Sequence, residues 1–201
     1  MKLYYSPGAC SLAPHIILQE LGLEFDLVQV DLYNKKTEFG DDFYEVSPHG
    51  RVPALQIANE DVLTESVAVL QYIADQHPKA GLAPDSGTFE RAKLQEALNF
   101  LTSDVHKAFG PLFAGGSDAE KQLAVQDIDS KLGYINKQLA GSEYLVGETF
   151  SIADAYLFVL TSWTIPTGMD LNKWPNLAAY FGRIASRTSV INAMQAEGLN
   201  G

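Results

Sequence analysis

The single cysteine of the chain, Cys10, is the residue whose type and place in the sequence point most directly to chemistry. It follows a short apolar run at residues 3–5 and a Ser-Pro-Gly turn at 6–8, and it precedes a helical pattern that begins at Ser11. A sulfur atom at a helix start meets unpaired backbone N–H groups and the positive end of the helix dipole, which favour the thiolate. We therefore expect an ionised sulfur. A lone cysteine closes no intramolecular disulfide, so its chemistry involves a partner thiol or none.

The dipeptide Val52-Pro53 marks a second candidate site. Proline has no N–H group and cannot lie in the middle of a strand ladder, so Pro53 belongs at the entrance of the strand that follows. A cis bond there would turn the Val52 backbone outward, free to pair with an extended peptide. The alternative is a trans proline at an ordinary loop end.

Glu65 and Ser66 form the third candidate site, at the start of a predicted helix. Backbone N–H groups at a helix N-terminus bind anions, and a carboxylate would suit them. Glu65 could hold an ammonium group beside it, so a ligand end with both α-amino and α-carboxylate groups would fit. The alternative is a second helix cap.

Composition limits the classes of partner. The chain has 201 residues and a formal net charge of −11, with 46% hydrophobic and 19% charged residues, which is typical of a globular protein with a real core. It has no basic run, so we expect neither nucleic acid nor a membrane as partner. An anionic ligand would need the few local cations, of which we single out Lys35, Lys36, Arg51 and Lys107. One cysteine, no signal-peptide core and no apolar run near ~20 residues predict a cytoplasmic protein.

The elements that must position these sites fall into two parts. Residues 1–77 predict strands at 2–5, 25–30, 54–57 and 62–64, the last two joined as a hairpin around Asn59-Glu60-Asp61, and helices at 12–21 and 66–76. Pro- and Gly-rich residues 78–87 predict a linker. Residues 88–201 predict helices at 89–109, 119–139, 152–163, 177–185 and 190–196.

Two patterns within the helical part concern packing. An apolar stripe on the 119–139 helix includes Leu123, Ile128 and Leu132. Ser151 and Asp154 have the spacing of a capping box, which we assign to folding rather than to chemistry.

Taken together, the three sites and the helical second half resemble a cytosolic glutathione S-transferase. The opening residues 1–12, with Asn99 and the Val105-His106-Lys107 run, resemble the bacterial beta class closely, and the likeness spans essentially the whole chain. The resemblance implies an α/β thioredoxin-like N-terminal domain followed by an all-α helical-bundle domain. The second domain would carry the co-substrate side and the contacts of a homodimer. Thioredoxins have Cys-x-x-Cys, but the second position here is Ala13, which excludes dithiol cycling.

The resemblance also implies roles for single residues, with glutathione as co-substrate and no metal. The implied catalytic residues are Cys10, Ser11 and His106. Those implied to bind glutathione are Lys35, Val52, Pro53 (cis), Glu65, Ser66, Asn99, Ser103 and Lys107, with Asn99 and Ser103 coming from the neighbouring subunit. Arg51 stands where this class often has an uncharged residue.

The implied reaction is attack of the glutathione thiolate on a small apolar electrophile. Phe109, Phe113 and Trp163 are candidates for lining the electrophile site, with plain core packing as the alternative. Two other functions stay open: glutathione-dependent thiol–disulfide exchange or peroxidase activity through Cys10, and a non-catalytic binding module on the same fold.

Overall fold

The structure is a computed structural model that describes residues 1–58 and 60–199. Contacts divide the chain into two compact units, Met1–Ala83 together with Ser186–Gly201, and Pro84–Ala185. None of the helices in the described residues is long and apolar enough to cross a membrane.

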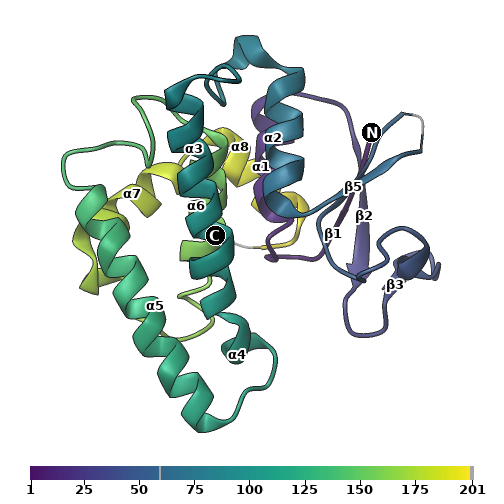
Figure 1. Cartoon of the computed structure of the whole chain (residues 1–201). Helices are drawn as coiled ribbons and strands as arrows, with labels where there is room; N and C mark the ends of the chain where they lie inside the picture. Colours follow the sequence, from purple (N-terminus) through teal and green to yellow (C-terminus); the bar gives the residue numbers. More distant parts are fainter. Residues whose placement is uncertain (59, 200–201) are drawn as a thin grey trace. The chain divides into compact units, whose positions relative to one another are not determined.

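The first unit is built on a mixed sheet with the strand order β3-β2-β1-β4-β5 (Figure 1). Its strands are β1 (Lys2–Tyr5), β2 (Asp26–Asp31), β3 (Lys36–Thr37), β4 (Ala54–Gln56) and β5 (Val62–Thr64). The central β1 pairs parallel with β2, because α1 (Leu12–Glu20) crosses between them, and antiparallel with β4. Helix α2 (Ser66–Gln76) follows β5 directly. The hairpin residue Asn59 lies outside the described residues.

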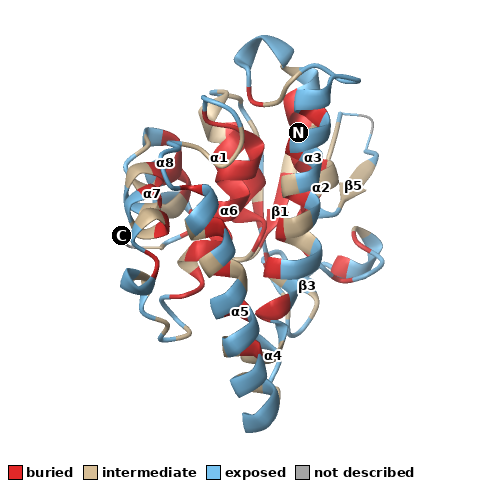
Figure 2. Cartoon of the chain, turned by 60° about the vertical axis from the view of Figure 1, so that its left-hand side comes forward, coloured by how far each residue is buried: buried red, intermediate tan, exposed pale blue. Residues whose placement is uncertain are grey.

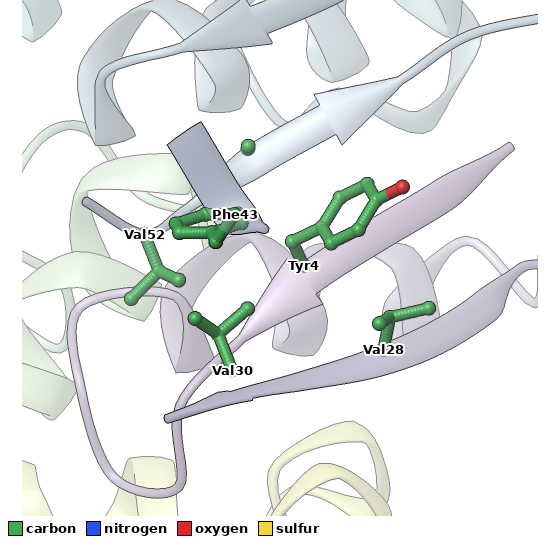
Figure 3. Close-up of a cluster of buried hydrophobic side chains, with 6 residues drawn as sticks. Tyr4, Val28, Val30, Phe43 and Val52 are labelled. Carbon is green, nitrogen blue, oxygen red and sulfur yellow. The ribbon is translucent and has the colours of Figure 1, made fainter. Parts of the chain in front are cut away.

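Alternation along the strands divides the core of this unit between the two faces of the sheet. Tyr4, Val28, Val30 and Val52 cluster with Phe43 on one face (Figure 3), where Phe43 belongs to the short 3₁₀ helix η1 (Phe43–Glu45). Leu3, the neighbour of Tyr4, points to the opposite face and is fully buried. The loop that precedes Pro53 is therefore anchored to the sheet by its valine.

The second unit is helical. It comprises α3 (Phe89–Phe100), the π-helix η3 (Leu101–His106), α4 (Gly110–Phe113), α5 (Asp118–Gln138), α6 (Ile152–Ser162), the 3₁₀ helix η4 (Leu171–Lys173) and α7 (Pro175–Ala185). In Figure 2, α6 is red along its length, since its residues from Ile152 to Thr161 are all buried, whereas α5 is largely exposed. The fold class expected from the sequence, an α/β part followed by an all-helical part, is confirmed.

The structure corrects three details. The helix expected at 89–109 is interrupted by the π-turn at Leu101–His106. Leu123 is 64% exposed, because the buried stripe of α5 runs through Ala124, Ile128, Leu132 and Ile135 instead. The strand β3 was not expected, since two residues are too few for a sequence pattern.

The C-terminal segment also differs from its expected place. Residues 186–201 were assigned to the helical domain 88–201, but they cluster with the first unit. The reason is that α8 (Thr188–Ala196) packs against α1 (Figure 1). Both helices have buried apolar side chains. The expected linker 78–87 contains the 3₁₀ turn η2 (Pro78–Ala80) and the boundary between the units.

Candidate active site

Cys10 lies in the loop between β1 and α1 and is 9% exposed. Its thiol donates a hydrogen bond to the backbone carbonyl of Val52, with Sγ 3.3 Å from the oxygen. The bond joins positions 42 residues apart in the sequence. The first and second candidate sites are therefore one site.

Burial raises the pKa of the Cys10 thiol, because removal from water disfavours the charged sulfur. Hydrogen bonds from the Ser66 hydroxyl and from the backbone N–H groups of Cys10 and Ser11 oppose this, and the Glu65 carboxylate adds to it. The expectation of an ionised Cys10 is therefore wrong: the helix start supplies the donors, but the cost of burying the charge is larger.

The peptide bond between Val52 and Pro53 is cis, as expected. Val52 is buried in the sheet cluster, while its carbonyl faces the Cys10 sulfur. Pro53 directly precedes β4, which begins at Ala54, so a missing N–H group interrupts no ladder.

The third site adjoins the same sulfur atom. Ser66 is buried at the first position of α2, and its hydroxyl hydrogen-bonds to Cys10. Glu65 is exposed. Its φ is 70°, a backbone conformation that is strained for residues other than glycine. Among the described residues no side chain caps α2, so the alternative of a second helix cap is wrong and the Glu65 carboxylate faces solvent.

The side chain of Lys35 reaches the loop that precedes Pro53. Its Nζ donates to the backbone carbonyl of Gly50, at 2.9 Å, two positions before Val52. Gly50 has a φ of +58°, and a Cβ atom there would lie 2.9 Å from the ring of Tyr44 and 3.1 Å from Cδ of Lys35. A side chain at position 50 would therefore collide with Tyr44 and Lys35, so only glycine lets the Lys35 side chain pass close to the backbone there. Lys35 itself has a φ of 57°, in a turn that the Asp31 carboxylate holds by accepting from backbone N–H groups.

Ser11 contributes to the site through its backbone rather than its side chain. The hydroxyl of Ser11 is buried, and it accepts from the Ser6 N–H (3.2 Å) and contacts the Ser6 carbonyl (3.3 Å). It therefore closes the loop that carries Cys10. The structure thus gathers, within the first unit, the candidates Cys10, Ser11, Lys35, Val52, Pro53, Glu65 and Ser66.

His106 lies in the second unit, at the end of the π-helix η3. Its Nδ1 is 2.7 Å from the hydroxyl of Tyr156, which in turn donates to Thr102 at 3.3 Å. Tyr156 was missed, because its place in an apolar run on α6 indicates core rather than a site. The network fixes the orientation of the imidazole.

The other candidates of this unit lie on the surface of α3, of η3 and of the residue that follows η3. Asn99, Ser103 and Lys107 are exposed. The Ser103 hydroxyl is 2.8 Å from the Asn99 carbonyl and 2.7 Å from the Asp104 carboxylate. These residues form a polar surface row at positions one helical turn apart.

The three aromatic candidates cluster around Trp163. The ring centroids of Phe109 and Phe113 each lie 5.4 Å from Trp163, and that of His106 lies 4.8 Å from it. Phe109 and Trp163 are buried, which fits core packing, whereas Phe113 is 52% exposed. Phe113 is therefore the member with surface available to a ligand.

Known families and structures match this chain over nearly its full length. The N-terminal domain model of glutathione S-transferases matches residues 8–76, and the C-terminal domain model matches residues 93–188. The chain is 42% identical to glutathione S-transferase GstA of Escherichia coli O157:H7, over 99% of this chain and 100% of the relative.

Two solved structures resemble it closely. A bacterial beta class glutathione S-transferase from Sphingomonas chungbukensis is 53% identical with a TM-score of 0.97, over 100% of both chains. A sphingomonad glutathione S-transferase complexed with glutathione is 49% identical with a TM-score of 0.96, again over 100% of both chains. The chain therefore belongs to the glutathione S-transferase family, and its fold is that of the bacterial beta class.

Proposed function

We propose that this protein conjugates the thiolate of glutathione to small apolar electrophiles. The observation that carries the proposal is the joint position of Cys10, Val52 and Ser66 around one sulfur atom. A relative 49% identical to this chain was solved with glutathione bound. Transferase activity of the chain follows from its family.

The site gives each end of glutathione a partner of matching charge. The γ-glutamyl end, which has an ammonium and a carboxylate, meets the Glu65 carboxylate and the start of α2 at Ser66. The cysteinyl part lies along the Val52 backbone before Pro53. The glycine carboxylate meets Lys35. Each charge-assisted hydrogen bond adds about 1.5–3 kcal/mol.

The raised pKa of Cys10 and its hydrogen bond to Val52 fit the role of a donor. A free thiol has a pKa of about 8.5, and lowering it by one unit raises the thiolate fraction at pH 7 about tenfold. When glutathione binds, the Cys10 S–H turns from the Val52 carbonyl to the glutathione sulfur; with the backbone N–H groups at the start of α1 it donates hydrogen bonds that stabilise the charge on that sulfur. The thiolate then attacks the electrophilic carbon. The raised pKa of Cys10 disfavours disulfide exchange, which requires a Cys10 thiolate.

The second unit supplies the co-substrate side. His106, whose imidazole Tyr156 orients, is the proposed catalytic residue of this unit, and the exposed face of Phe113 is the proposed surface for the electrophile. Asn99, Ser103 and Lys107 approach glutathione in a homodimer, with Asn99 and Ser103 reaching that of the neighbouring subunit. Their exposure at positions one helical turn apart supports this contact. We place the protein in the cytoplasm.

Calorimetry with glutathione and an assay with an aryl halide test the proposal together. We expect saturable heat of binding and turnover in the native protein. Lys35→Met should raise the glutathione Kd about tenfold or more, because it removes one charge-assisted hydrogen bond. The matched control is Lys36→Met, which removes an exposed lysine one position along and should change Kd less than twofold.

A third variant separates conjugation from thiol–disulfide exchange. Cys10→Ala should keep measurable conjugation and lose any turnover of a mixed-disulfide substrate. Absence of heat with glutathione would refute the site, and binding without turnover of any electrophile would favour the non-catalytic module.

A further inference from the structure

The loop that carries Cys10 is held by a residue from the far end of the chain. The backbone N–H of Gly8 donates to Oε2 of Glu197 at 2.9 Å, across 189 residues of sequence. Glu197 follows α8 directly, and its side chain is fully buried. A buried carboxylate is stable only when its oxygens are paired, so this contact is a defined part of the fold.

The other oxygen of the same carboxylate contacts α1. Oε1 of Glu197 lies 2.8 Å from Nδ1 of His15, whose side chain is also fully buried. Gly8 precedes Cys10 by two residues, and His15 follows it by five. One carboxylate therefore fixes the chain on both sides of the cysteine.

The residues next to Glu197 reinforce this contact. Gly8 has a φ of +69°, and a Cβ atom there would lie 3.5 Å from Cδ2 of Leu199. Leu199 is held in place because its N–H donates to the Met194 carbonyl at 2.8 Å. The segment that follows α8 therefore covers the Gly8 turn as well as bonding to it.

A second polar contact joins the same two helices at their other ends. The carboxylate of Glu20, the last residue of α1, is hydrogen-bonded to Arg187 and Ser189 at the start of α8. This contact lies far along α1 from Cys10. It supplies a matched control, since its loss weakens the docking of α8 without touching the cysteine loop.

We propose that Glu197 is a positioning residue for Cys10: it fixes the Gly8 turn and α1 relative to each other and so sets where the sulfur and its neighbouring N–H groups lie. The role of those groups in catalysis rests on the proposed function. The family models end at residues 76 and 188, so Glu197 lies beyond both.

The rate at which iodoacetamide alkylates Cys10 in the absence of glutathione tests the proposal first. Glu197→Ala should raise this rate about tenfold, because loss of the anchor lets the loop open and expose a buried thiol. Glu197→Asp, which keeps the charge but withdraws the carboxylate, should raise it about threefold. Glu197→Gln should react at a rate between the native and the Glu197→Ala rates, since its amide oxygen still accepts from Gly8 while its NH2 group replaces the oxygen that contacts His15.

Steady-state kinetics provide the second arm. Glu197→Ala should raise the KM for glutathione about tenfold or more through misplacement of the sulfur site. Glu20→Gln should leave both the alkylation rate and this KM within twofold, while lowering the denaturant midpoint.

The outcomes are separable. Native alkylation rates in the Glu197→Ala and Glu197→Asp variants would overturn the proposal, as would an equal increase in Glu20→Gln, which would assign the effect to docking of α8. If Glu197→Ala does not fold, the Asp and Gln variants decide it. Failure of the native protein to bind glutathione would refute the proposed function and leave the alkylation result valid.

Discussion

Cys10 illustrates how two opposing effects on a single residue are decided by burial. The start of α1 supplies N–H donors to the sulfur, and Ser66 supplies a hydroxyl, and all of these lower the thiol pKa. Desolvation raises it by more. In this structure the thiol donates a hydrogen bond to the Val52 carbonyl, and its raised pKa favours the donor role over that of a nucleophile. This distinction separates a residue that assists a bound thiolate from one that itself forms disulfides.

The pH dependence of Cys10 reactivity follows from this direction. Because the pKa of Cys10 is raised, the thiol should stay protonated through neutral pH, and its alkylation rate should still rise above pH 9. Iodoacetamide labelling followed by intact-protein mass spectrometry between pH 6 and 10 measures the profile. Cys10→Ser, which should take up no label, is the control. A rate that levels off by pH 7–8 would contradict the raised pKa.

At the scale of elements, two helices begin with the same motif in different surroundings. Ser117 and Glu120 form an exposed capping box at α5, and Ser151 and Asp154 form a buried one at α6. Asp154 also accepts from the Leu145 N–H and from the hydroxyl of Tyr180. Burial raises the pKa of the Asp154 carboxyl, although these hydrogen bonds oppose the shift. The sequence assignment of this pair to folding fits these contacts.

Replacing each box tests the effect of burial. Asp154→Ala should lower the free energy of unfolding by about 3 kcal/mol, because several buried donors lose their acceptor. Ser117→Ala should cost clearly less, since water can replace the exposed hydroxyl. Urea denaturation followed by circular dichroism compares them. Equal losses in the two variants would show that the contacts of Asp154 beyond the helix cap contribute nothing to stability.

At the scale of the molecule, the chain leaves the first unit after Ala83 and returns to it at Ser186. The return places α8 on α1 and brings Glu197 to the cysteine loop. The first unit is therefore completed only when the last residues are present. Both tryptophans, Trp163 and Trp174, belong to the second unit, whereas Cys10 belongs to the first. Cys10 alkylation therefore reports on the first unit, and tryptophan fluorescence reports on the second.

Ending the chain at Ala185 should affect the two probes differently. Loss of α8 uncovers the apolar side of α1, so Cys10 should become at least about tenfold more reactive toward iodoacetamide. Glutathione binding should be lost, while tryptophan fluorescence should still report a cooperative denaturant transition of the helical unit. A native alkylation rate in the shortened chain would show that residues 186–201 are dispensable for the cysteine loop.

The sequence by itself determined the elements whose signals are local. The strands at Lys2–Tyr5 and Val62–Thr64 and the helix Ser66–Gln76 have the predicted bounds, because alternation, helical periodicity and breaker residues act within a few positions. The capping box at Ser151 was predicted for the same reason, whereas the cis bond before Pro53 was implied by the family resemblance and left open by the residues alone. Motif order along the chain was also enough to indicate the family.

Only the tertiary structure decided the features that depend on burial and on distant contacts. The state of Cys10 depends on how much water the fold removes from its sulfur, which its neighbours in sequence do not determine. The hydrogen bonds of Glu197 to Gly8 and His15, and that of His106 to Tyr156, each join positions at least 50 residues apart, and so does the packing of α8 on α1. Such contacts form because buried polar groups must find partners wherever the chain brings them, and no local pattern records where that will be.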